Sequence, residues 1–534
     1  MNIVFLSTEA VPLAKTGGLA DVCGALPTQL ARRGHQVSLI MPAFRSIYAS
    51  GIPIEPTEIS FALPMRGSVV GARLLKAELP GGDDNPVEVY FIDQPQYYDR
   101  PSLYGDASGD YPDNCERFAF FCRGAVHAIE RLGRPVDIVH CNDWQTGLVP
   151  AYMTLEETRR PWMKRARSVL TIHNLAYQGH FWHWDYPLTG LDWKHFRPEG
   201  LEFYGHLNML KTGIVYADKI TTVSPTYAKE IQSELHGCGL DPLLRSRSDV
   251  LHGITNGIDD EIWNPATDKY LRLPHQRGLP PAPSSSEPGG SGNYDVDTWE
   301  VGKAIQKRRL QEAFDLRVDP ELPLIGLVGR LAGQKGWDLI IEVLRGHLEQ
   351  TRPTQWVILG TGEPRYHEQL TALASIYPER FGLKLGFSDE LAHQIEAAAD
   401  IFVMPSRYEP CGLNQLYSLR YGTVPVVTAT GGLVDTVVDA TPENLAAGTA
   451  TGFHVREFSA AELDRTLGLA LQMRFHDKKN WRTLVESGMR QDWSWGKSAA
   501  QYEKLYAATI PLTPPGDANR RRLARHDYAK FGKK

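Results

Sequence analysis

The sequence predicts an α/β protein built from two doubly wound units. Short apolar runs alternate with helical patterns along almost the whole chain, and the alternation occurs twice. The apolar runs are continuous and lack a period of two, which is typical of parallel strands buried on both faces. The helical stretches between them supply the crossovers that parallel strands need.

The predicted elements follow in chain order. Strands of the first unit are expected at Ile3–Leu6, Val37–Met41, Val87–Ile92, Ile138–Cys141, Ser168–Ile172 and Lys219–Val223. Strands of the second unit are expected at Leu324–Val328, Trp356–Leu359, Leu383–Leu385, Ile401–Met404 and Val424–Val427. Helices are expected at Ala20–Arg33, Arg117–Leu132, Trp337–Arg345, Glu390–Ala398 and Leu413–Tyr421.

The domain boundaries follow from this pattern. The first domain is expected to span residues 1–253, completed by a C-terminal helix at 494–511, and the second to span 254–493. A Pro-, Gly- and Ser-rich segment at 278–293 cannot hold a core, so it is expected to be a surface insertion. Residues 512–534 form a basic tail, for which a solvated end and a contact with an anionic partner are both possible.

Composition excludes several classes of protein. With 534 residues, 42% hydrophobic residues, 22% charged residues and a net charge of −6, the chain has the composition of a soluble enzyme. A mildly acidic chain gives no support to nucleic-acid binding. Six scattered cysteines without a C-x-x-C pair favour free thiols in a reducing compartment. The N-terminus has no basic segment before its four apolar residues, and no run could span a bilayer, so we expect a cytoplasmic protein without a membrane partner.

The loop after the first predicted strand has the composition of an anion-binding turn. It reads Lys15-Thr16-Gly17-Gly18 and leads directly into a helical pattern. Adjacent glycines let a ligand approach the backbone, and the start of a helix offers N–H groups to an anion. A tight structural turn would have the same sequence, and the loop lacks the G-x-G-x-x-G spacing of a dinucleotide site.

Two cations follow the first strand of the second unit. Arg330 and Lys335 lie in the loop GRLAGQKG, beyond the strand's carboxyl end, where ligands bind in open α/β sheets. A guanidinium that forks onto phosphate oxygens and a lysine that adds a point charge would suit a pyrophosphate. An exposed surface loop remains the alternative. The spacing is not that of a Walker A loop.

A third motif, PSRYEPCGLNQ, follows the strand that ends at Met404. Glu409 is placed to bind sugar hydroxyls, and the N–H groups of Cys411, Gly412 and Leu413 are placed to bind a phosphate at the start of a helix. Cys411 could also act as a nucleophile with a lowered pKa, but no histidine follows nearby, which favours a role for its backbone.

Polar residues also end two strands of the first unit. His173 and Asn174 follow one strand, and Asp143 follows the strand before it. A histidine at a strand's carboxyl end with polar neighbours favours a functional role over a core hydrogen bond. Strand-end turns at Asn256 and at 360–362 are functional or purely structural. The sequence has no H-E-x-x-H, EF-hand loop, close Asp-x-Asp or G-x-S-x-G, so neither a metal site nor a covalent triad is indicated.

Seven segments together resemble the bacterial glycogen synthases and plant starch synthases. They read KTGGLADV, HCNDWQTGL, TIHNLAYQG, TVSPTYAKEI, ITNGID, GRLAGQKGWDL and PSRYEPCGLNQLYSLRYGTVP. The likeness runs in the family's order from Met1 to about Tyr506. It implies the glycosyltransferase-B fold, in which two Rossmann-like domains face each other across the cleft that holds the active site. It also implies transfer of glucose from ADP-glucose to the non-reducing-end 4-hydroxyl of an α-1,4-glucan, with retention and without a metal or other cofactor.

The resemblance gives roles to individual residues. The catalytic group would be His173 at the glucosyl ring, Arg330 and Lys335 at the departing pyrophosphate, and Glu409 at the glucose. Donor-binding residues would be Lys15, Gly17, Gly18, Gly360, Thr361, Gly362, Phe387, Cys411, Gly412 and Leu413. Residues that line the cleft on the acceptor side would be Glu9, Asp21, Asp143, Asn174 and Asn256.

Two positions depart from the family pattern and bear on the choice of donor. Phe387 stands where a tyrosine is expected beside the base, and Asn414 stands where threonine is frequent. A retaining transferase of the same fold that uses UDP-glucose or a small acceptor therefore stays open. A catalytically silent glucan- or nucleotide-binding module and a Rossmann oxidoreductase are further alternatives, although the second lacks G-x-G-x-x-G.

Overall fold

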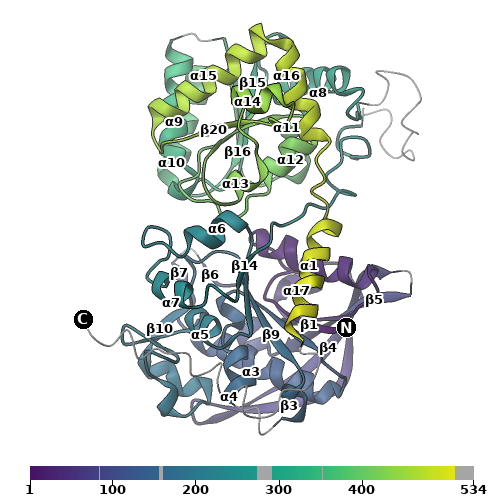
Figure 1. Ribbon diagram of the computed structural model, residues 1–534, viewed down its shortest axis with the longest axis vertical. Coiled ribbons are helices and arrows are strands. Elements are labelled where there is room, and N and C mark those ends of the chain that lie inside the picture. The colour runs from purple at the N-terminus through teal and green to yellow at the C-terminus, as the bar shows by residue number, and fades with distance from the viewer. Residues whose placement is uncertain (83, 107, 156–159, 273–291, 351–352, 511–534) are drawn as a thin grey trace. The chain divides into compact units, whose positions relative to one another are not determined.

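The computed structural model describes residues 1–82, 84–106, 108–155, 160–272, 292–350 and 353–510 (Figure 1). The chain divides into two compact units, Ile258–Ser494 and the remainder, which joins Met1–Gly257 to the segment from Trp495. The predicted insertion at 278–293 lies outside the described residues except for its last two, and the basic tail at 512–534 lies outside them entirely. No helix in the described ranges is long and apolar enough to cross a membrane.

The first unit is built on a nine-stranded sheet with the order β14-β13-β9-β8-β1-β2-β5-β4-β3. Its strands are β1 (Asn2–Leu6), β2 (Gln36–Pro42), β3 (Glu55–Met65), β4 (Ser68–Gly82), β5 (Asn85–Asp93), β8 (Ile138–Asn142), β9 (Arg167–Ile172), β13 (Lys219–Thr222) and β14 (Leu251–Gly253). The seven strands from β14 to β5 run parallel, whereas β3, β4 and β5 pair antiparallel. The order reverses between β1 and β8, so their carboxyl ends flank the crevice where ligands bind in doubly wound sheets.

Helices and a small second sheet complete this unit. The helices are α1 (Gly18–Arg32), α2 (Pro95–Tyr98), α3 (Asn114–Leu132), α4 (Val149–Leu155), α5 (Met209–Tyr216), α6 (Pro225–Glu230), α7 (Asp241–Ser246) and α17 (Trp495–Thr509). The small sheet joins β10 (His180–Trp182), β12 (His206–Asn208) and β11 (Glu202–Phe203), and β6 (Gly105–Asp106) pairs with β7 (Gly109–Asp110).

The C-terminal helix α17 packs into the core of the first unit. Tyr502 and Tyr506 are buried there, and the Tyr506 hydroxyl lies 2.7 Å from Nδ1 of His140 on β8. On the surface, Glu503 accepts a hydrogen bond from Arg33 at the end of α1. The chain therefore returns to its first unit after completing the second.

The second unit has a six-stranded parallel sheet with the order β17-β16-β15-β18-β19-β20. Its strands are β15 (Leu324–Val328), β16 (Gln355–Gly360), β17 (Phe381–Leu385), β18 (Ile401–Met404), β19 (Val424–Thr428) and β20 (Phe453–Val455). Its helices are α8 (Trp299–Ala313), α9 (Trp337–Glu349), α10 (Pro364–Ile376), α11 (Asp389–Ala398), α12 (Asn414–Arg420), α13 (Gly431–Thr436), α14 (Pro442–Ala446), α15 (Ala460–His476) and α16 (Lys478–Met489). This is the strand order of a Rossmann fold, and it reverses between β15 and β18.

Both faces of that sheet are covered. Alternate residues of β16 enter two different apolar cores, with Trp356 and Ile358 in one and Val357 and Leu359 in the other. Side chains of a strand point alternately to opposite faces, so a strand covered on both sides is apolar throughout. This explains the continuous apolar runs in the sequence.

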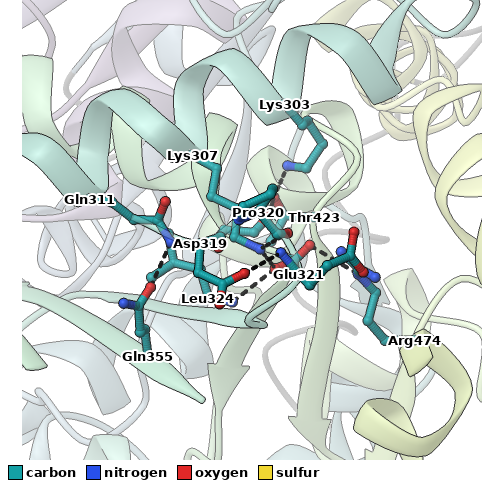
Figure 2. Close-up of polar contacts among 12 residues, drawn as sticks. Lys303, Lys307, Gln311, Asp319, Pro320, Glu321, Leu324, Gln355, Thr423 and Arg474 are labelled. Carbon is teal, nitrogen blue, oxygen red and sulfur yellow. Dashed lines mark hydrogen bonds and ion pairs between the residues drawn. The ribbon is translucent and has the colours of Figure 1, made fainter. Parts of the chain in front are cut away.

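Polar contacts fix helix α8 to the sheet, as Figure 2 shows. Lys303 is buried and donates to Thr423 Oγ1 at 2.7 Å, and Lys307 donates to Asp400 Oδ2 at 2.8 Å. Arg474 of α15 reaches the other oxygen of Asp400 at 3.1 Å. The two cations hold the pKa of the Asp400 carboxyl down at about 2 despite its burial. Paired charges therefore tie α8 and α15 to the end of the loop before β18.

The prediction of two doubly wound α/β units is confirmed, and each predicted strand matches an observed strand within two residues. Among the helices, α3 begins three residues before its predicted start and α9 continues four residues beyond its predicted end. The hairpin β3–β4, the small sheet and several helices of the second unit were not predicted from the sequence. All six cysteines are free thiols, and Cys238 is the exposed one.

Candidate active-site residues

In the second unit, two residues of the predicted catalytic group meet at the point where the strand order reverses. Lys335 follows β15 and Glu409 follows β18, and the Lys335 Nζ donates to Glu409 Oε2 at 2.5 Å. Ser406 Oγ donates to the same oxygen at 2.9 Å. The Glu409 side chain is 7% exposed, whereas that of Lys335 is 28% exposed, so the ammonium group remains open to an anion from solvent.

Arg330 lies in the same loop as Lys335, five residues earlier in the chain, and is exposed. Among the described residues it has no ion-pair or side-chain hydrogen-bond partner. Its carbonyl accepts a hydrogen bond from the indole of Trp337 at 2.7 Å, which fixes the backbone of the loop. A guanidinium without a side-chain partner and an ammonium group in one loop after β15 give this strand end two positive charges, which suit phosphate oxygens.

The loop that carries Lys335 depends on a glycine for its shape. Gly336 has a φ of 75°, and a Cβ atom there would lie 2.1 Å from the carbonyl oxygen of Pro405. The loop after β18 is tied to the same loop, because the Arg407 amide donates to the Gln334 carbonyl at 2.8 Å. The two strand-end loops are therefore packed backbone to backbone, which brings Lys335 to Glu409.

The predicted phosphate-binding amides precede a short helix. Helix α12 begins at Asn414, so Cys411, Gly412 and Leu413 lie in the turn before it rather than in its first turn. Gly412 has a φ of 73°, and the amides of Gly412 and Leu413 have no partner in the described part of the chain. Cys411 is buried, consistent with a contribution through its backbone.

The predicted adenosine site gathers at the ends of β16 and β17. The Gly386 amide donates to the Gly360 carbonyl at 2.9 Å, and the Leu331 amide donates to the Thr361 carbonyl at 2.9 Å. A Cβ atom at Gly362 would lie 2.3 Å from the Leu331 carbonyl oxygen, so this turn needs glycine for its packing. Phe387 follows Gly386 directly in the chain and is 80% exposed.

In the first unit, Glu9 organises the Lys15 loop from inside. Its carboxylate accepts hydrogen bonds from the Thr16 amide at 2.5 Å, the Gly17 amide at 3.2 Å and the Tyr104 hydroxyl at 2.7 Å. The residue is 3% exposed. Its oxygens are used within the protein, where they shape the loop; that Glu9 lines the cleft stays a prediction.

Lys15 and its neighbours lie at the exposed start of α1. Lys15 Nζ lies 2.7 Å from Asp21 Oδ1, and their side chains are 44% and 24% exposed. Helix α1 begins at Gly18, with Gly17 as the residue before it, and a Cβ atom at Gly17 would meet nothing within 4 Å. Gly17 is therefore open to a ligand rather than packed against the protein.

Asp143 and His173 are in direct contact, at the ends of the neighbouring strands β8 and β9. The Asp143 carboxylate accepts a hydrogen bond from the His173 amide at 2.7 Å. Asp143 is buried and has a φ of 55°, which is rare for a residue other than glycine and is typical of functional sites. Burial raises the pKa of the Asp143 carboxyl to about 7, although hydrogen bonds from the amides of His173 and Asn174 oppose the shift.

The hydrogen bonds of Asn142 determine the tautomer of His173. The Asn142 amide nitrogen donates to the carbonyls of Leu6 at 3.1 Å and His140 at 3.4 Å, so its oxygen faces His173 Nε2 at 3.0 Å. Burial lowers the pKa of His173 to about 3, which keeps the imidazole neutral. Nε2 is therefore the donor, and Nδ1 remains as an acceptor for a ligand hydroxyl.

The side chains of two predicted cleft residues, Asn174 and Asn256, make no hydrogen bond to Asp143 or His173 that the structure describes. The Asn174 side chain accepts a hydrogen bond from the Ala176 amide at 3.0 Å and so closes a local turn. Asn256 follows β14, at the far edge of the same sheet from β1, and its buried Oδ1 has no hydrogen-bond partner. The structure does not bring Asn256 into contact with the Asp143–His173 pair.

Three residues with clear roles were missed by the sequence analysis. Asn142 orients His173, Ser406 orients Glu409, and Tyr104 holds Glu9. Asn142 and Ser406 belong to motifs that were recognised, so their polar character at a strand end was a usable signal. Tyr104 had none. No group of three or more His, Cys, Asp or Glu side chains in the described ranges is arranged to hold a metal ion.

Comparisons with known proteins show the family to which the chain belongs. Residues 2–246 match the family model of the starch synthase catalytic domain, and residues 309–483 match that of glycosyl transferases group 1. The chain is 55% identical over 528 residues to a glycogen synthase of Rhodopirellula baltica, which covers 98% of this chain and 99% of the relative. It is 45% identical over 516 residues to glycogen synthase 1 of Methylococcus capsulatus, with 96% and 97% covered.

A solved structure shows the same fold. The catalytic domain of starch synthase IV from Arabidopsis thaliana, bound to ADP and acarbose, superposes with a TM-score of 0.84 at 31% identity. The alignment covers 95% of this chain and 99% of that one.

Proposed function

Because the chain is a glycosyltransferase of the glycogen and starch synthase family, we propose that it transfers glucose from ADP-glucose to an α-1,4-glucan. Membership of this family implies a nucleotide-sugar donor and a glucan acceptor. The finer proposal is that the donor is ADP-glucose and that the acceptor is the non-reducing-end 4-hydroxyl. The anomeric configuration is retained and no metal takes part.

The observation that carries the donor side is the Lys335–Glu409 pair, in a loop that also presents the exposed side chain of Arg330. Breaking the bond between the anomeric carbon and the diphosphate leaves negative charge on ADP and positive charge on the sugar. Two fixed cations stabilise the leaving group, and each such donor is worth roughly 3 kcal/mol. Glu409, ion-paired and 7% exposed, is held ready to accept hydrogen bonds from the glucose hydroxyls.

The proposed reaction proceeds on one face of the sugar. The bond from the anomeric carbon to the diphosphate oxygen breaks, and the acceptor 4-hydroxyl oxygen forms the new bond from the same side. The acceptor proton passes to the leaving phosphate oxygen, so the products are an elongated glucan and ADP. A neutral His173 does not supply that proton, because its pKa lies at about 3.

The acceptor side rests on the strand ends of the first unit. His173 offers Nδ1 as a hydrogen-bond acceptor to a sugar hydroxyl, and the Lys15 ammonium and the open Gly17 backbone contribute to binding the donor. We propose a reducing, cytoplasmic setting, which the six free thiols support.

The competing donor is UDP-glucose, and the residue that bears on it is Phe387. This exposed ring is expected to lie against the base, where it stacks on either adenine or uracil. Adenine offers the larger ring system to such a stack, which supports ADP-glucose as the preferred donor.

A product analysis tests the reaction itself. The protein is incubated with ADP-glucose and maltohexaose, and the product is examined by proton NMR and by digestion with β-amylase. We expect maltoheptaose whose new anomeric proton has the coupling of an α-linkage and whose new unit is released by the amylase. A β-linked product would contradict retention, and transfer to free glucose but not to maltohexaose would favour the small-acceptor alternative.

A further inference from the structure

We propose that the small sheet of the first unit carries a glucan-binding platform separate from the catalytic residues. Its surface, called here the aromatic face, consists of His180, Trp182, Trp184, Phe203, Tyr204 and His206. The apolar C–H faces of successive glucose units would stack on these rings, and the imidazoles would hydrogen-bond to hydroxyls. The inference rests on the proposed function for its ligand, an α-1,4-glucan chain.

Strand pairing puts the aromatic rings on one side of the sheet. Trp182 of β10 lies opposite His206 of β12, and Phe203 of β11 lies opposite the same histidine. Their neighbours point the other way, since Leu207 is fully buried and Phe181 contacts the ring of Trp144 with centroids 5.6 Å apart. One side of the small sheet therefore packs on the loop after β8, and the other side presents rings.

The rings form an unbroken series rather than scattered side chains. Trp182 contacts His206 with centroids 6.0 Å apart, and His206 contacts His180 at 4.8 Å. His180 continues to Phe203 at 5.8 Å, and Phe203 continues to Tyr204 at 4.6 Å. At the other end, His183 lies 5.5 Å from Trp182 and 4.7 Å from Trp184. A linear ligand with a repeated apolar face suits such a series.

The largest rings of the series are exposed. Trp182 is 57% exposed, Trp184 is 72% exposed and Tyr204 is 79% exposed. Single exposed apolar side chains are ordinary, but contiguous ones mark binding surfaces. Because the patch contains imidazoles, indoles and one phenol group instead of aliphatic side chains, it fits a ligand with both C–H faces and hydroxyls. A surface that binds anionic lipid would require lysine or arginine, and the aromatic face contains neither.

The backbone supplies a second, independent observation. Tyr204 and Gly205 form the two-residue turn between β11 and β12, and both have positive φ angles, 49° and 79°. Such turns favour Asn, Asp or Gly at the first position, because a side chain with a bulky Cβ substituent is strained there. A tyrosine in that position contributes almost no packing in return, since most of its ring faces solvent. Residues held in such conformations cluster at sites that bind ligands.

The platform is continuous with the candidate acceptor region. The loop after β9 begins with His173 and leads into β10 within a few residues. Backbone hydrogen bonds hold the two together, with the Met209 amide donating to Gly179 at 3.0 Å and the Leu210 amide donating to Gln178 at 3.0 Å. A glucan held on the aromatic face would thus keep its chain ends near the loop that carries His173.

The test measures glucan affinity in the full-length protein. Trp182→Ala removes a central ring, and Tyr204→Asn removes the outer ring while placing a residue that fits the turn, so its fold is secure. Tyr48→Ala is the matched control, because Tyr48 is 58% exposed and does not belong to the aromatic face. Dissociation constants come from retardation in native gels that contain glycogen and from calorimetric titration with maltoheptaose.

We expect Trp182→Ala to weaken glycogen binding about tenfold and Tyr204→Asn to weaken it several-fold, by analogy with the loss of one aromatic stacking contact. The KM for glycogen rises accordingly, while kcat and the KM for ADP-glucose stay unchanged. Tyr48→Ala leaves the dissociation constant unchanged. Unchanged glycogen affinity in both platform variants, or an equal loss in the control, would overturn the platform.

Two further outcomes separate this inference from the function on which it rests. If wild-type protein transfers glucose to glycogen but the platform variants bind glycogen as it does, the platform is wrong and the function stands. If the variants weaken glycogen binding while the wild type transfers no glucose, the platform stands and the function is wrong. If the variants change the oligomeric state, as measured by light scattering, and leave glycogen affinity unchanged, the aromatic face is a contact between copies of the chain. That outcome would refute the platform.

Discussion

Removing the ammonium group of Lys335 should reduce turnover far more than it reduces stability. In the free protein this group is 2.5 Å from Glu409, and in the reaction it is proposed to face the departing diphosphate. Losing one fixed donor to developing negative charge costs about 3–4 kcal/mol in the transition state, which corresponds to a 10²–10³-fold loss in kcat. We expect that loss for Lys335→Ala.

The effect on folding is smaller because the pair is only partly buried. Lys335 is 28% exposed, and Glu409 keeps the hydrogen bond from Ser406. The remaining cost is that of a carboxylate left without its charged partner, about 1–2 kcal/mol in the free energy of unfolding. Adding Glu409→Gln removes the unpaired charge, so the double variant should regain stability relative to Lys335→Ala without regaining turnover.

The assay combines initial rates at saturating ADP-glucose and glycogen with urea unfolding of the three variants. Lys335→Arg serves as the control that keeps the charge, and we expect its kcat to lie between those of wild type and Lys335→Ala. A kcat for Lys335→Ala within tenfold of wild type would refute the role given to this residue. A double variant that recovers both stability and turnover would show that the pair is purely structural.

Three further predictions concern the backbone and the titrating groups. Gly336→Ala should lower the free energy of unfolding by about 2 kcal/mol or more and reduce turnover, because its Cβ would lie 2.1 Å from a carbonyl oxygen. Gly346→Ala, inside the helix α9 that follows Gly336, should raise the free energy of unfolding by about 0.5–1 kcal/mol, because its Cβ would meet nothing within 4 Å. Calorimetry of the two variants checks this. The Asp143 carboxyl, with its pKa raised from an ordinary 3.8 to about 7, stabilises the fold fully below pH 3.8 and loses that contribution as the pH rises to 7. As the pH increases from 4 to 8, the Tm of Asp143→Asn should therefore rise relative to the Tm of wild type. Since the pKa of His173 is about 3, the pH profile of kcat/KM should show no limb from this imidazole between pH 5 and 8, and His173→Asn should lower the profile without changing its shape.

The parallel core of both units could be predicted because its strands are apolar along their whole length. The hairpin β3–β4 was missed for the opposite reason. Its strands alternate between exposed and buried residues, as antiparallel strands with one solvated face do, so they contain no continuous apolar run. The strands of the small sheet have only two or three residues, too few to show any period.

The candidate site was predictable as a set of strand ends, but not as a set of contacts. Lys335 and Glu409 are 74 residues apart, and they meet because β15 and β18 are neighbours in a sheet whose order is not sequential. The order of the strands in the sheet cannot be read from the spacing of residues along the chain. The inward role of Glu9 was likewise hidden, because it depends on Tyr104, which is far from Glu9 in the sequence.

The measurement that tests the proposed reaction most directly is glucose transfer to glycogen from ADP-glucose and, separately, from UDP-glucose, with EDTA present throughout. We predict transfer from ADP-glucose that EDTA does not reduce, and a much lower kcat/KM with UDP-glucose. A preference for UDP-glucose would contradict the proposed donor and place the error at Phe387. Loss of transfer on adding EDTA would contradict the metal-independent mechanism that gives the leaving-group charge to Arg330 and Lys335.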